Sequence, residues 1–596
     1  MAAFRARSAD RARGHAGTCS QPADSRQVAS APPPNPRRGR PQGICRLRTY
    51  HREVNELRTG WPPGAWRRAA GVTALFTALT AAMTWPQVLV FGTHAAGHQD
   101  VFFNLWRLRW HAHALASPTA DLFNGNIFYP EQGVLAYSDA LLVQGWLAAP
   151  LLWAGMPPVL VHNLLLLGAI VASAVGICVL TRHLTGSTGG GVVAGAVFAF
   201  APYRFDHYMH MELQWTVWVP WAFWALQRTI ETGTLRFGVL TGVFVAMQVG
   251  SSIYYGVFLL VLIGAVAALQ LLPLRGAHLR QAAAALCLGG AIAGLASWAY
   301  SRPYSAAAER VGERSIQDVK TFSARPRDYR MATPTNRLYG SDVGRPERRL
   351  SPGILAPLLA VVGLIAAPTR VAVAYLLGLV LAFELSLGAY GMVYPVLYEH
   401  VSVFRGLRAP ARAAVFCLFF LGVLAGHLTG ALTRVSPARW RPAIGALVCG
   451  AILFEYRHAP LELVEYPNDP PPLHRFMAHL PPGVVAEFPM PKPDAPPHFD
   501  ARYAYMSSFH WLPLVNGYSG FYPRSYSLRL IRMQTFPDAT TVTSLKGENV
   551  RYVVVHEEGY PEGERQRIVD RLLELGGRRL ADFEDGWSLA TVVELP

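Results

Sequence analysis

Apolar residues gather in long runs between residues 69 and 456, and polar segments separate these runs. A helix needs ~20 apolar residues to cross the hydrocarbon core of a bilayer. The pattern therefore predicts an α-helical polytopic membrane protein with about eleven crossings. The predicted spans are residues 69–92, 159–181, 189–204, 213–228, 236–252, 254–273, 281–300, 353–367, 371–390, 412–431 and 441–456.

One more apolar stretch, residues 141–156, is short and ends at Pro157-Pro158. If it enters the membrane without crossing it, the Arg clusters between the spans lie on the same side as the basic N-terminus. If it crosses, they all move to the other side. The positive-inside bias favours the first arrangement. We therefore predict a cytoplasmic N-terminus in the cell membrane and five external segments, 93–140, 204–213, 301–352, 391–411 and 457–596.

The last of these segments differs from the membrane domain, residues 66–456, in its pattern of apolar residues. Strand-like runs occur at Val484–Phe488, Val550–His556 and Trp587–Val593, and Glu562–Leu575 has a helical pattern that ends at Gly576-Gly577. Glycine commonly terminates a helix. Strands that alternate with helices predict a small extracytoplasmic α/β domain over residues 457–596.

Composition and charge agree with a membrane protein. The chain is 52% hydrophobic and 15% charged, whereas soluble domains carry about 25% charged residues. The net charge is +16, and residues 1–68 alone hold 14 Arg and 4 acids. Because the basic excess lies beside the first span, it is typical of a topology signal, and no nucleic-acid partner is predicted. Residues 1–65 have no apolar pattern and are predicted to be a disordered cytoplasmic tail.

The first external segment, 93–140, holds the most informative polar residues. Asp100 follows His98 just beyond the first span, and apolar residues follow it at 102, 103, 106, 110 and 114. This spacing predicts an interfacial helix with its Trp residues at headgroup depth. We expect Asp100 to face a pocket, with His98 beside the substrate. The alternative is that Asp100 caps the helix that follows.

This predicted architecture resembles the GT-C superfamily of membrane glycosyltransferases. It has one span, a large external loop that opens with an acidic residue and a surface helix, many further spans and an external C-terminal domain. The stretch Val515–Phe521 resembles bacterial membrane proteins of this general type. The resemblance implies a polyprenyl-phosphate-linked sugar donor, with Asp100 as the base for the acceptor hydroxyl and cations or a metal on the departing phosphate. The family often has two adjacent acids, but here Gln99 precedes Asp100.

A polar cluster lies between two spans at residues 203–215. Ionisable groups at membrane depth usually face a cavity, so we expect substrate-binding roles for Arg204, Asp206, His207, His210 and Glu212. Imidazole and carboxylate donors suit zinc or manganese. A divalent ion held by His207, His210 and Glu212 is therefore an open alternative, and no cofactor is required. A short hydrated loop that satisfies the helix ends is the other interpretation.

A third cluster places Arg405, Arg408 and Arg412 at the external mouth of a span. Guanidinium groups bind phosphate well, and an external Arg cluster runs against the positive-inside bias. We expect these residues to bind a phosphate; pairing with membrane lipids is the alternative. Arg302 and Tyr304, at the start of the loop 301–352, are further candidates for substrate binding.

These observations favour a glycosyltransferase that acts on an external acceptor. Two other functions remain open. A transporter or flippase would need internal repeats and ionisable residues near the midplane, whereas the ionisable residues here gather at span ends. A non-catalytic membrane scaffold for the cell envelope would have a cavity with no carboxylate near the Arg cluster.

Overall fold

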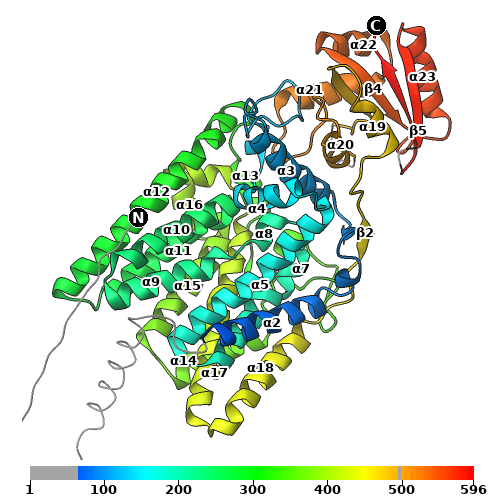
Figure 1. Cartoon of the computed structure of the whole chain (residues 1–596). Coiled ribbons are helices and arrows are strands. Elements are labelled where there is room, and N and C mark those ends of the chain that lie inside the picture. Colours follow the sequence, from blue (N-terminus) through cyan, green and yellow to red (C-terminus); the bar gives the residue numbers. More distant parts are fainter. Residues whose placement is uncertain (1–64, 494–498, 585) are drawn as a thin grey trace, which may run out of the picture. The chain divides into compact units, whose positions relative to one another are not determined.

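The computed structural model describes residues 65–493, 499–584 and 586–596. A helix lies at each of the eleven predicted spans (Figure 1). The tail prediction for residues 1–65 lies outside the described residues except at Ala65. The helices are α2 (Ala65–Met83), α5 (Pro158–Thr185), α6 (Thr188–Phe200), α9 (Trp218–Thr232), α10 (Leu235–Ser251), α11 (Ile253–Leu271), α12 (Gly276–Val311), α14 (Leu355–Ala366), α15 (Arg370–Ser386), α17 (Ala414–Val435) and α18 (Arg441–Tyr456).

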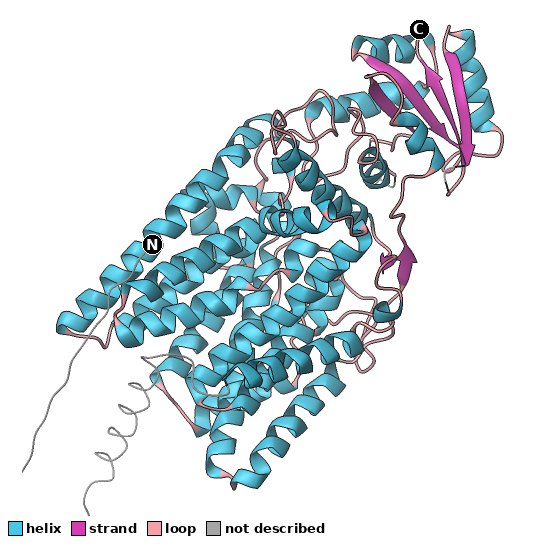
Figure 2. Ribbon diagram, in the orientation of Figure 1, coloured by secondary structure: helices cyan, strands magenta, loops and turns pink. Residues whose placement is uncertain are grey.

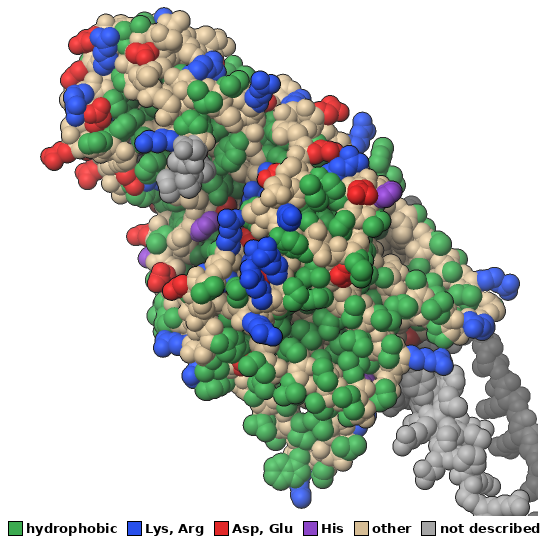
Figure 3. Space-filling model, turned by 180° about the vertical axis from the view of Figure 1, so that it is seen from behind, with side chains coloured by type: hydrophobic (Ala, Val, Ile, Leu, Met, Phe, Trp, Pro, Cys, Tyr) green, Lys and Arg blue, Asp and Glu red, His purple; other side chains and the backbone are tan. Residues whose placement is uncertain are grey.

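Within the described residues, four helical segments are long and apolar enough to cross a membrane, namely Pro158–Thr185, Ile253–Leu271, Gly276–Val311 and Pro410–Val435. Figure 3 shows that apolar side chains cover most of the helical part on the face it displays, and that charged side chains are denser on the sheet-containing part. This apolar surface fits contact with lipid. The count of eleven crossings stays a prediction.

The stretch 141–156 forms the short helix α4 (Leu142–Trp153) of 12 residues. At 1.5 Å per residue it is about 18 Å long, which is too short to cross a hydrocarbon core of about 30 Å. Its Trp146 and Trp153 are exposed. The helix therefore has the length expected of a segment that enters the membrane without crossing it.

The boundary predicted at residue 300 is wrong. Helix α12 continues to Val311 as one 36-residue helix, with Pro303 inside it. Three alanines and Glu309 follow Pro303, and these residues favour helix strongly enough to extend it beyond the apolar run. Arg302 and Tyr304 therefore lie on a helix and not at the start of a loop.

The first external segment also differs from its prediction. Helix α3 (Gln99–Ala116) forms as expected, but its Trp106 and Trp110 are only 0% and 5% exposed. Helix α4 packs on one part of α3, and α20 (Asp500–Ser507) of the C-terminal segment packs on another. The helix is therefore buried under protein, because the C-terminal segment covers the apolar face that we expected to meet lipid.

Small residues allow the helices to approach closely. Helices α9, α10, α11 and α12 run side by side (Figure 1), and α10 packs on α12 along a stripe of small residues. A Cβ atom added at Gly242 would lie 2.1 Å from the carbonyl oxygen of Gly289, and one at Gly238 equally close to that of Ala285. Side chains larger than hydrogen would force these helices apart.

Two short strands connect the segment after α2 with the segment after α18. Strand β1 (His94–Ala96) pairs antiparallel with β2 (Leu463–Glu465), which follows α18. The Tyr466 hydroxyl donates a hydrogen bond of 2.7 Å to the carbonyl of Ala96. These contacts fix the segment that leads into α3.

The C-terminal segment forms a four-stranded sheet in the order β3-β4-β6-β5, made of β3 (Val484–Phe488), β4 (Val550–His556), β5 (Arg578–Glu584) and β6 (Leu589–Glu594) (Figure 2). Strands β3 and β4 are parallel, and the other pairs are antiparallel. The strands predicted at 484–488 and 550–556 match β3 and β4. Strand β5 was not predicted, because its exposed, charged sequence lacks an apolar run.

Helices complete this segment. Helix α23 (Glu564–Glu574) buries Ile568, Val569 and Leu572 in the core shared with the sheet, and Gly576 follows it at φ +92° as the pattern predicted. The remaining helices of the segment are α19 (Pro472–Met477), α20, α21 (Arg524–Arg532) and α22 (Ala539–Gly547), and the short helices elsewhere are α7 (Pro202–Asp206), α8 (Met211–Gln214), α13 (Ile316–Thr321) and α16 (Val393–His400). Single 3₁₀ turns are η1 (Gln87–Leu89), η2 (Val134–Tyr137), η3 (Pro326–Arg330), η4 (Pro346–Arg348), η5 (Gly388–Tyr390), η6 (Ser402–Gly406), η7 (Pro410–Ala413), η8 (Ala438–Trp440) and η9 (Met533–Thr535).

Candidate active site

A cavity of about 960 Å³, here called the central cavity, lies where the segments predicted to be external meet. Residues from α3, α8, α11, α12, the 401–412 segment and the 518–521 segment form its wall. The wall therefore brings together side chains that are up to about 400 positions apart in the sequence. Its ionisable and phenolic side chains are Asp100, Arg107, Tyr137, Asp139, His210, Glu212, Tyr254, Tyr300, Tyr304, Glu309, Glu313, Arg314, Arg408, Arg412 and Tyr518.

Asp100 occupies the first turn of α3 and is not its cap. The N-cap is His98, whose Nδ1 accepts a 3.1 Å hydrogen bond from the backbone N–H of Asp100. The carboxylate of Asp100 is therefore available for other contacts. A negative charge in the first turn is also stabilised by the helix dipole. The alternative that Asp100 serves as the cap is thereby excluded.

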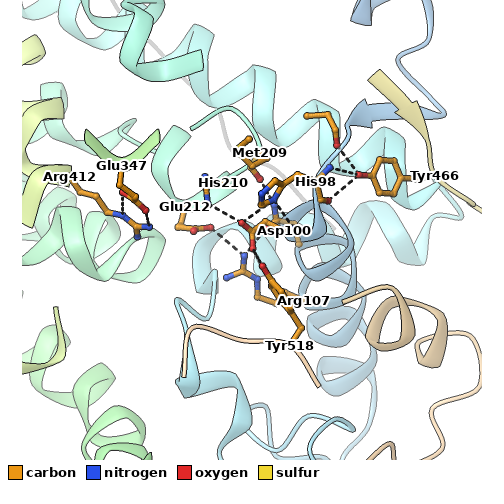
Figure 4. A network of polar contacts seen from close by, with 12 residues as sticks. His98, Asp100, Arg107, Met209, His210, Glu212, Glu347, Arg412, Tyr466 and Tyr518 are labelled. Carbon is orange, nitrogen blue, oxygen red and sulfur yellow. Dashed lines mark hydrogen bonds and ion pairs between the residues drawn. The ribbon is translucent and has the colours of Figure 1, made fainter. Parts of the chain in front are cut away.

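Three side chains contact the Asp100 carboxylate (Figure 4): His98, whose Nδ1 lies 3.3 Å from Oδ2, and two residues from other segments. Nε2 of His210 lies 2.9 Å from Oδ2, and the Tyr518 hydroxyl donates a 2.8 Å hydrogen bond to Oδ1. Burial alone would raise the pKa of Asp100, but the hydrogen bond from His210 contributes to holding it well below its usual range. Burial would lower the pKa of His210, and its bond to Asp100 raises it above 6.5. The contact therefore favours the ionised form of both groups.

A second buried group connects α3 to α8. Arg107 donates to Glu212 across 3.3 Å and to the carbonyl of Asp139, and both charged side chains of the ion pair are at most 9% exposed. The Asp139 carboxylate accepts a 2.7 Å hydrogen bond from the N–H of Ile253. Burial and the charge of Glu212 raise the pKa of Asp139 to about 6. Asp139 is therefore a second carboxylate on the wall that can exchange a proton near neutral pH.

The three arginines of the 405–412 segment have different environments. Arg412 makes a bidentate ion pair with Glu347 of η4, with N–O distances of 2.6 and 3.3 Å. Arg405 pairs with Glu313 at 3.4 Å and is not part of the cavity wall. Arg408 lies on the wall with its guanidinium over the ring of Phe322. Arg412 is thus neutralised by an acid, Arg405 lies outside the cavity wall, and Arg408 lies on it.

Arg408 has a neighbour of the same kind. Arg314 also lies on the wall, stacks on Phe521 at 3.4 Å and donates to the carbonyl of Gly520. Burial and the charge of Arg408 lower the pKa of Arg314 to about 10. In the described part of the chain, no carboxylate lies within ion-pair distance of either guanidinium. Two neighbouring cations without counterions form a site suited to a phosphate.

Several predicted site residues lie away from the wall. Arg204 is buried and donates to the carbonyls of Leu213 and Gln214, so it fixes the loop that carries His210. Asp206 pairs with Arg349 at 3.2 Å. His98, Arg302 and Arg405 also lie outside the wall. The wall does include the predicted residues Asp100, His210, Glu212, Tyr304, Arg408 and Arg412.

The proposed metal ligands do not form a site. Among the described residues, no group of three or more His, Cys, Asp or Glu side chains is arranged to hold a metal ion. His210 is directed to Asp100 and Glu212 to Arg107, while His207 is buried with Nε2 3.9 Å from Glu347. Burial lowers the pKa of His207 to about 3. Each candidate ligand thus has a different carboxylate or guanidinium partner.

Sequence reasoning missed Arg107, Asp139, Arg314, Glu347 and Tyr518. Arg107 and Asp139 carried a usable signal, because each is a charged residue within or beside an apolar stretch of the first external segment. Arg314 and Glu347 are hidden among the many charges of the loop 301–352. Tyr518 lies in the stretch 515–521 that the resemblance indicated, but only the fold brings it to Asp100.

No family model and no curated protein matches this chain. Among solved structures, it is similar to the arabinofuranosyltransferase AftD from Mycobacteria, with a TM-score of 0.55 and 16% identity over 88% of this chain and 41% of AftD. It is also similar to the oligosaccharyltransferase AglB from Archaeoglobus fulgidus, with a TM-score of 0.46 and 11% identity over 83% of this chain and 70% of AglB. For ArnT from Cupriavidus metallidurans the TM-score is 0.45, with 12% identity over 88% of this chain and 98% of ArnT.

The similarity to AftD shows that the chain has the fold of the GT-C glycosyltransferases, as the sequence resemblance predicted. The chain spans less than half of the length of AftD.

Proposed function

From this fold and this cavity, we propose that the chain is a membrane glycosyltransferase that moves a sugar from a polyprenyl-phosphate donor to an acceptor outside the cytoplasm. One observation carries the proposal: the partly buried carboxylate of Asp100 lines the same cavity as the guanidiniums of Arg314 and Arg408, which have no carboxylate partner among the described residues. In the transfer, an acceptor hydroxyl forms a bond to the anomeric carbon, and the bond from that carbon to the phosphate oxygen breaks.

Asp100 receives the proton of the acceptor hydroxyl. Its contacts with His210 and Tyr518 fix the carboxylate and keep it ionised, so it can accept a hydrogen bond from the hydroxyl before the reaction. Its low pKa makes it a weak base. Efficient general bases have a pKa near the working pH, and Asp139 fits that condition better. Asp139 is therefore the competing candidate for the base.

Arg314 and Arg408 receive the departing lipid phosphate, whose negative charge grows as the bond breaks. Cations placed where charge develops stabilise the transition state more than the ground state. Arg412 would stabilise the phosphate less, because Glu347 already neutralises its charge.

The cavity also has an apolar region that suits a prenyl chain. Leu260 of α11, Trp298 of α12 and Val403 line it and are 37%, 60% and 41% exposed. These side chains extend the cavity wall to the apolar outer surface of the helices, and lipid-linked substrates need such a route.

The test uses the full chain in proteoliposomes with a tritiated polyprenyl-phosphate arabinose or mannose as donor. Asp100→Asn should lower transfer about 10²–10⁴-fold, the typical contribution of a general base. Asp342→Asn is the matched control, because Asp342 is exposed and outside the wall. Normal transfer by Asp100→Asn at normal protein level would remove Asp100 from the mechanism. If Asp139→Asn alone abolishes transfer, Asp139 is the base.

A further inference from the structure

A basic pocket separate from the central cavity is lined by the segment between α12 and α14 and by Tyr390 of η5. It has a volume of about 280 Å³ and shares no lining residue with the cavity. Four of its lining residues are cationic, and the others can donate or accept hydrogen bonds. The lining residues are Gln317, Lys320, Thr321, Arg325, Arg345, Arg348 and Tyr390.

The cations of this pocket exceed the acids that could neutralise them. Arg348 is paired with Asp328 through contacts of 2.8 and 3.1 Å. Lys320, Arg325 and Arg345 have no carboxylate within ion-pair distance among the residues that the structure describes. Like charges repel when they are held together, so the pocket favours an anion that enters from outside.

Tyr390 organises the pocket. Nη2 of Arg325 donates a 2.9 Å hydrogen bond to the Tyr390 hydroxyl, and the guanidinium lies 4.9 Å from the centre of its ring. The Lys320 ammonium lies 5.9 Å from the same ring. Two of the three unpaired cations are therefore held against one aromatic side chain.

Exposed apolar side chains continue from the same aromatic residue. Met392 is 82% exposed and Val396 of α16 is 56% exposed, and α16 packs on η5, which ends at Tyr390. Ile316, which begins α13, is 46% exposed. Cations beside exposed apolar side chains are typical of a surface that meets the headgroups and the upper acyl region of a bilayer.

We propose that this pocket binds the phosphate of an anionic phospholipid, whose acyl chains lie over Met392 and Val396. A phosphodiester accepts hydrogen bonds from several cations at once. A soluble anion would satisfy the cations but would leave the apolar side chains exposed. The phospholipid satisfies both.

Lipid binding at this pocket would also influence the wall of the central cavity, through η4. This turn places Arg345 and Arg348 at the basic pocket and directs Glu347 to Arg412 on the cavity wall. Lipid binding therefore holds the segment that positions Glu347. Binding itself requires neither Asp100 nor sugar transfer, so the proposal stands independently of the proposed function.

The experiment measures lipid retained by the full chain after purification in detergent micelles with equal amounts of phosphatidylglycerol and phosphatidylcholine. Extraction and mass spectrometry give the ratio of the two lipids per protein. The wild type should retain phosphatidylglycerol several-fold over the micelle ratio. The triple variant Lys320→Gln/Arg325→Gln/Arg345→Gln should lose that enrichment and retain the two lipids at the micelle ratio.

The matched control is Arg327→Gln/Arg330→Gln/Arg337→Gln, which removes three exposed cations of the same segment that lie outside the pocket. It should keep the enrichment. Equal loss in both triple variants would overturn the proposal, because net charge alone would then explain binding. Unchanged enrichment in the pocket variant would also overturn it.

A second arm distinguishes the two sources of phosphate. Inorganic phosphate at millimolar concentration should leave the enrichment intact, because it lacks acyl chains. If it displaces phosphatidylglycerol from the wild type, the site recognises a soluble anion and the lipid assignment is wrong. Asp100→Asn is included because it should keep the enrichment even if it abolishes sugar transfer.

Discussion

Replacement of single arginines in the 405–412 segment tests whether the central cavity binds a phosphate. Arg408 and Arg405 are three residues apart, yet only Arg408 lies on the cavity wall without a carboxylate partner in the described residues. Arg408→Gln removes a cation that would contact the phosphate. Arg405→Gln removes the same charge from a neighbouring position and is the matched control.

The expected magnitudes follow from these environments. A hydrogen bond to a charged group contributes about 1.5–3 kcal/mol, and about 1.4 kcal/mol corresponds to tenfold in rate. Arg408→Gln should therefore lower kcat/KM roughly 10- to 150-fold. Arg405 and Glu313 are 37% and 51% exposed, and such surface pairs contribute about 0–1 kcal/mol. Arg405→Gln should change kcat/KM at most about fivefold.

Arg412→Gln should behave differently from both, because it leaves Glu347 without its partner. Their side chains are 8% and 17% exposed, and breaking a buried pair costs about 3–5 kcal/mol of stability. Arg412→Gln/Glu347→Gln should recover much of this loss, because no unpaired charge remains.

Sugar transfer in proteoliposomes gives kcat/KM for each variant, and thermal unfolding in detergent reports its stability. The reasoning is refuted if Arg405→Gln lowers transfer as much as Arg408→Gln while both remain as stable as the wild type. Equal activity of Arg408→Gln and the wild type would equally exclude Arg408 from phosphate binding.

Three further predictions concern the site and the helices. Tyr518→Phe removes the 2.8 Å hydrogen bond to Asp100 and should lower transfer about tenfold; an unchanged rate would show that this contact has no role in transfer. Gly242→Ala places a Cβ 2.1 Å from a backbone oxygen of α12 and should destabilise the fold by about 1–3 kcal/mol. The control Gly264→Ala, where an added Cβ has nothing within 4 Å, should not destabilise it. Equal melting temperatures of the two variants would contradict the close packing. Because the pKa of His210 is raised above 6.5, its protonated form stabilises the fold fully below that value and loses the effect as pH rises through the raised pKa. The difference in melting temperature between wild type and His210→Gln should be largest below pH 6.5 and shrink as the pH rises above it, and a difference that grows with pH would contradict the assignment.

Local patterns in the sequence determined the elements. Long apolar runs placed a helix at each predicted span, and short apolar runs placed β3 and β4, because burial in lipid or in the core of a sheet requires apolar side chains. The same reasoning failed at α12, where helix propensity carried the helix past the end of the apolar run. It also missed β5, which pairs with β6 but has no apolar run of its own.

Some residues of the cavity wall could be identified from the sequence, but the residues that contact them could not. The positions of Asp100, His210, Glu212 and Arg408 at the ends of apolar runs indicate these four residues, and all four line one cavity. Which charges are neutralised could not be read from the chain. Arg405 and Arg412 have carboxylate partners 92 and 65 positions away, and no local pattern indicates contacts of that separation.

The sequence by itself determined that the chain builds a bundle of apolar helices with polar clusters at one set of helix ends. Only the tertiary structure decided that Tyr518 reaches Asp100, that Trp106 is buried by protein, and that Arg408 has no carboxylate partner among the described residues. The physical reason is that hydrophobic periodicity acts over a few residues, whereas the pairing of charges depends on which distant segments the fold brings within a few ångströms of one another.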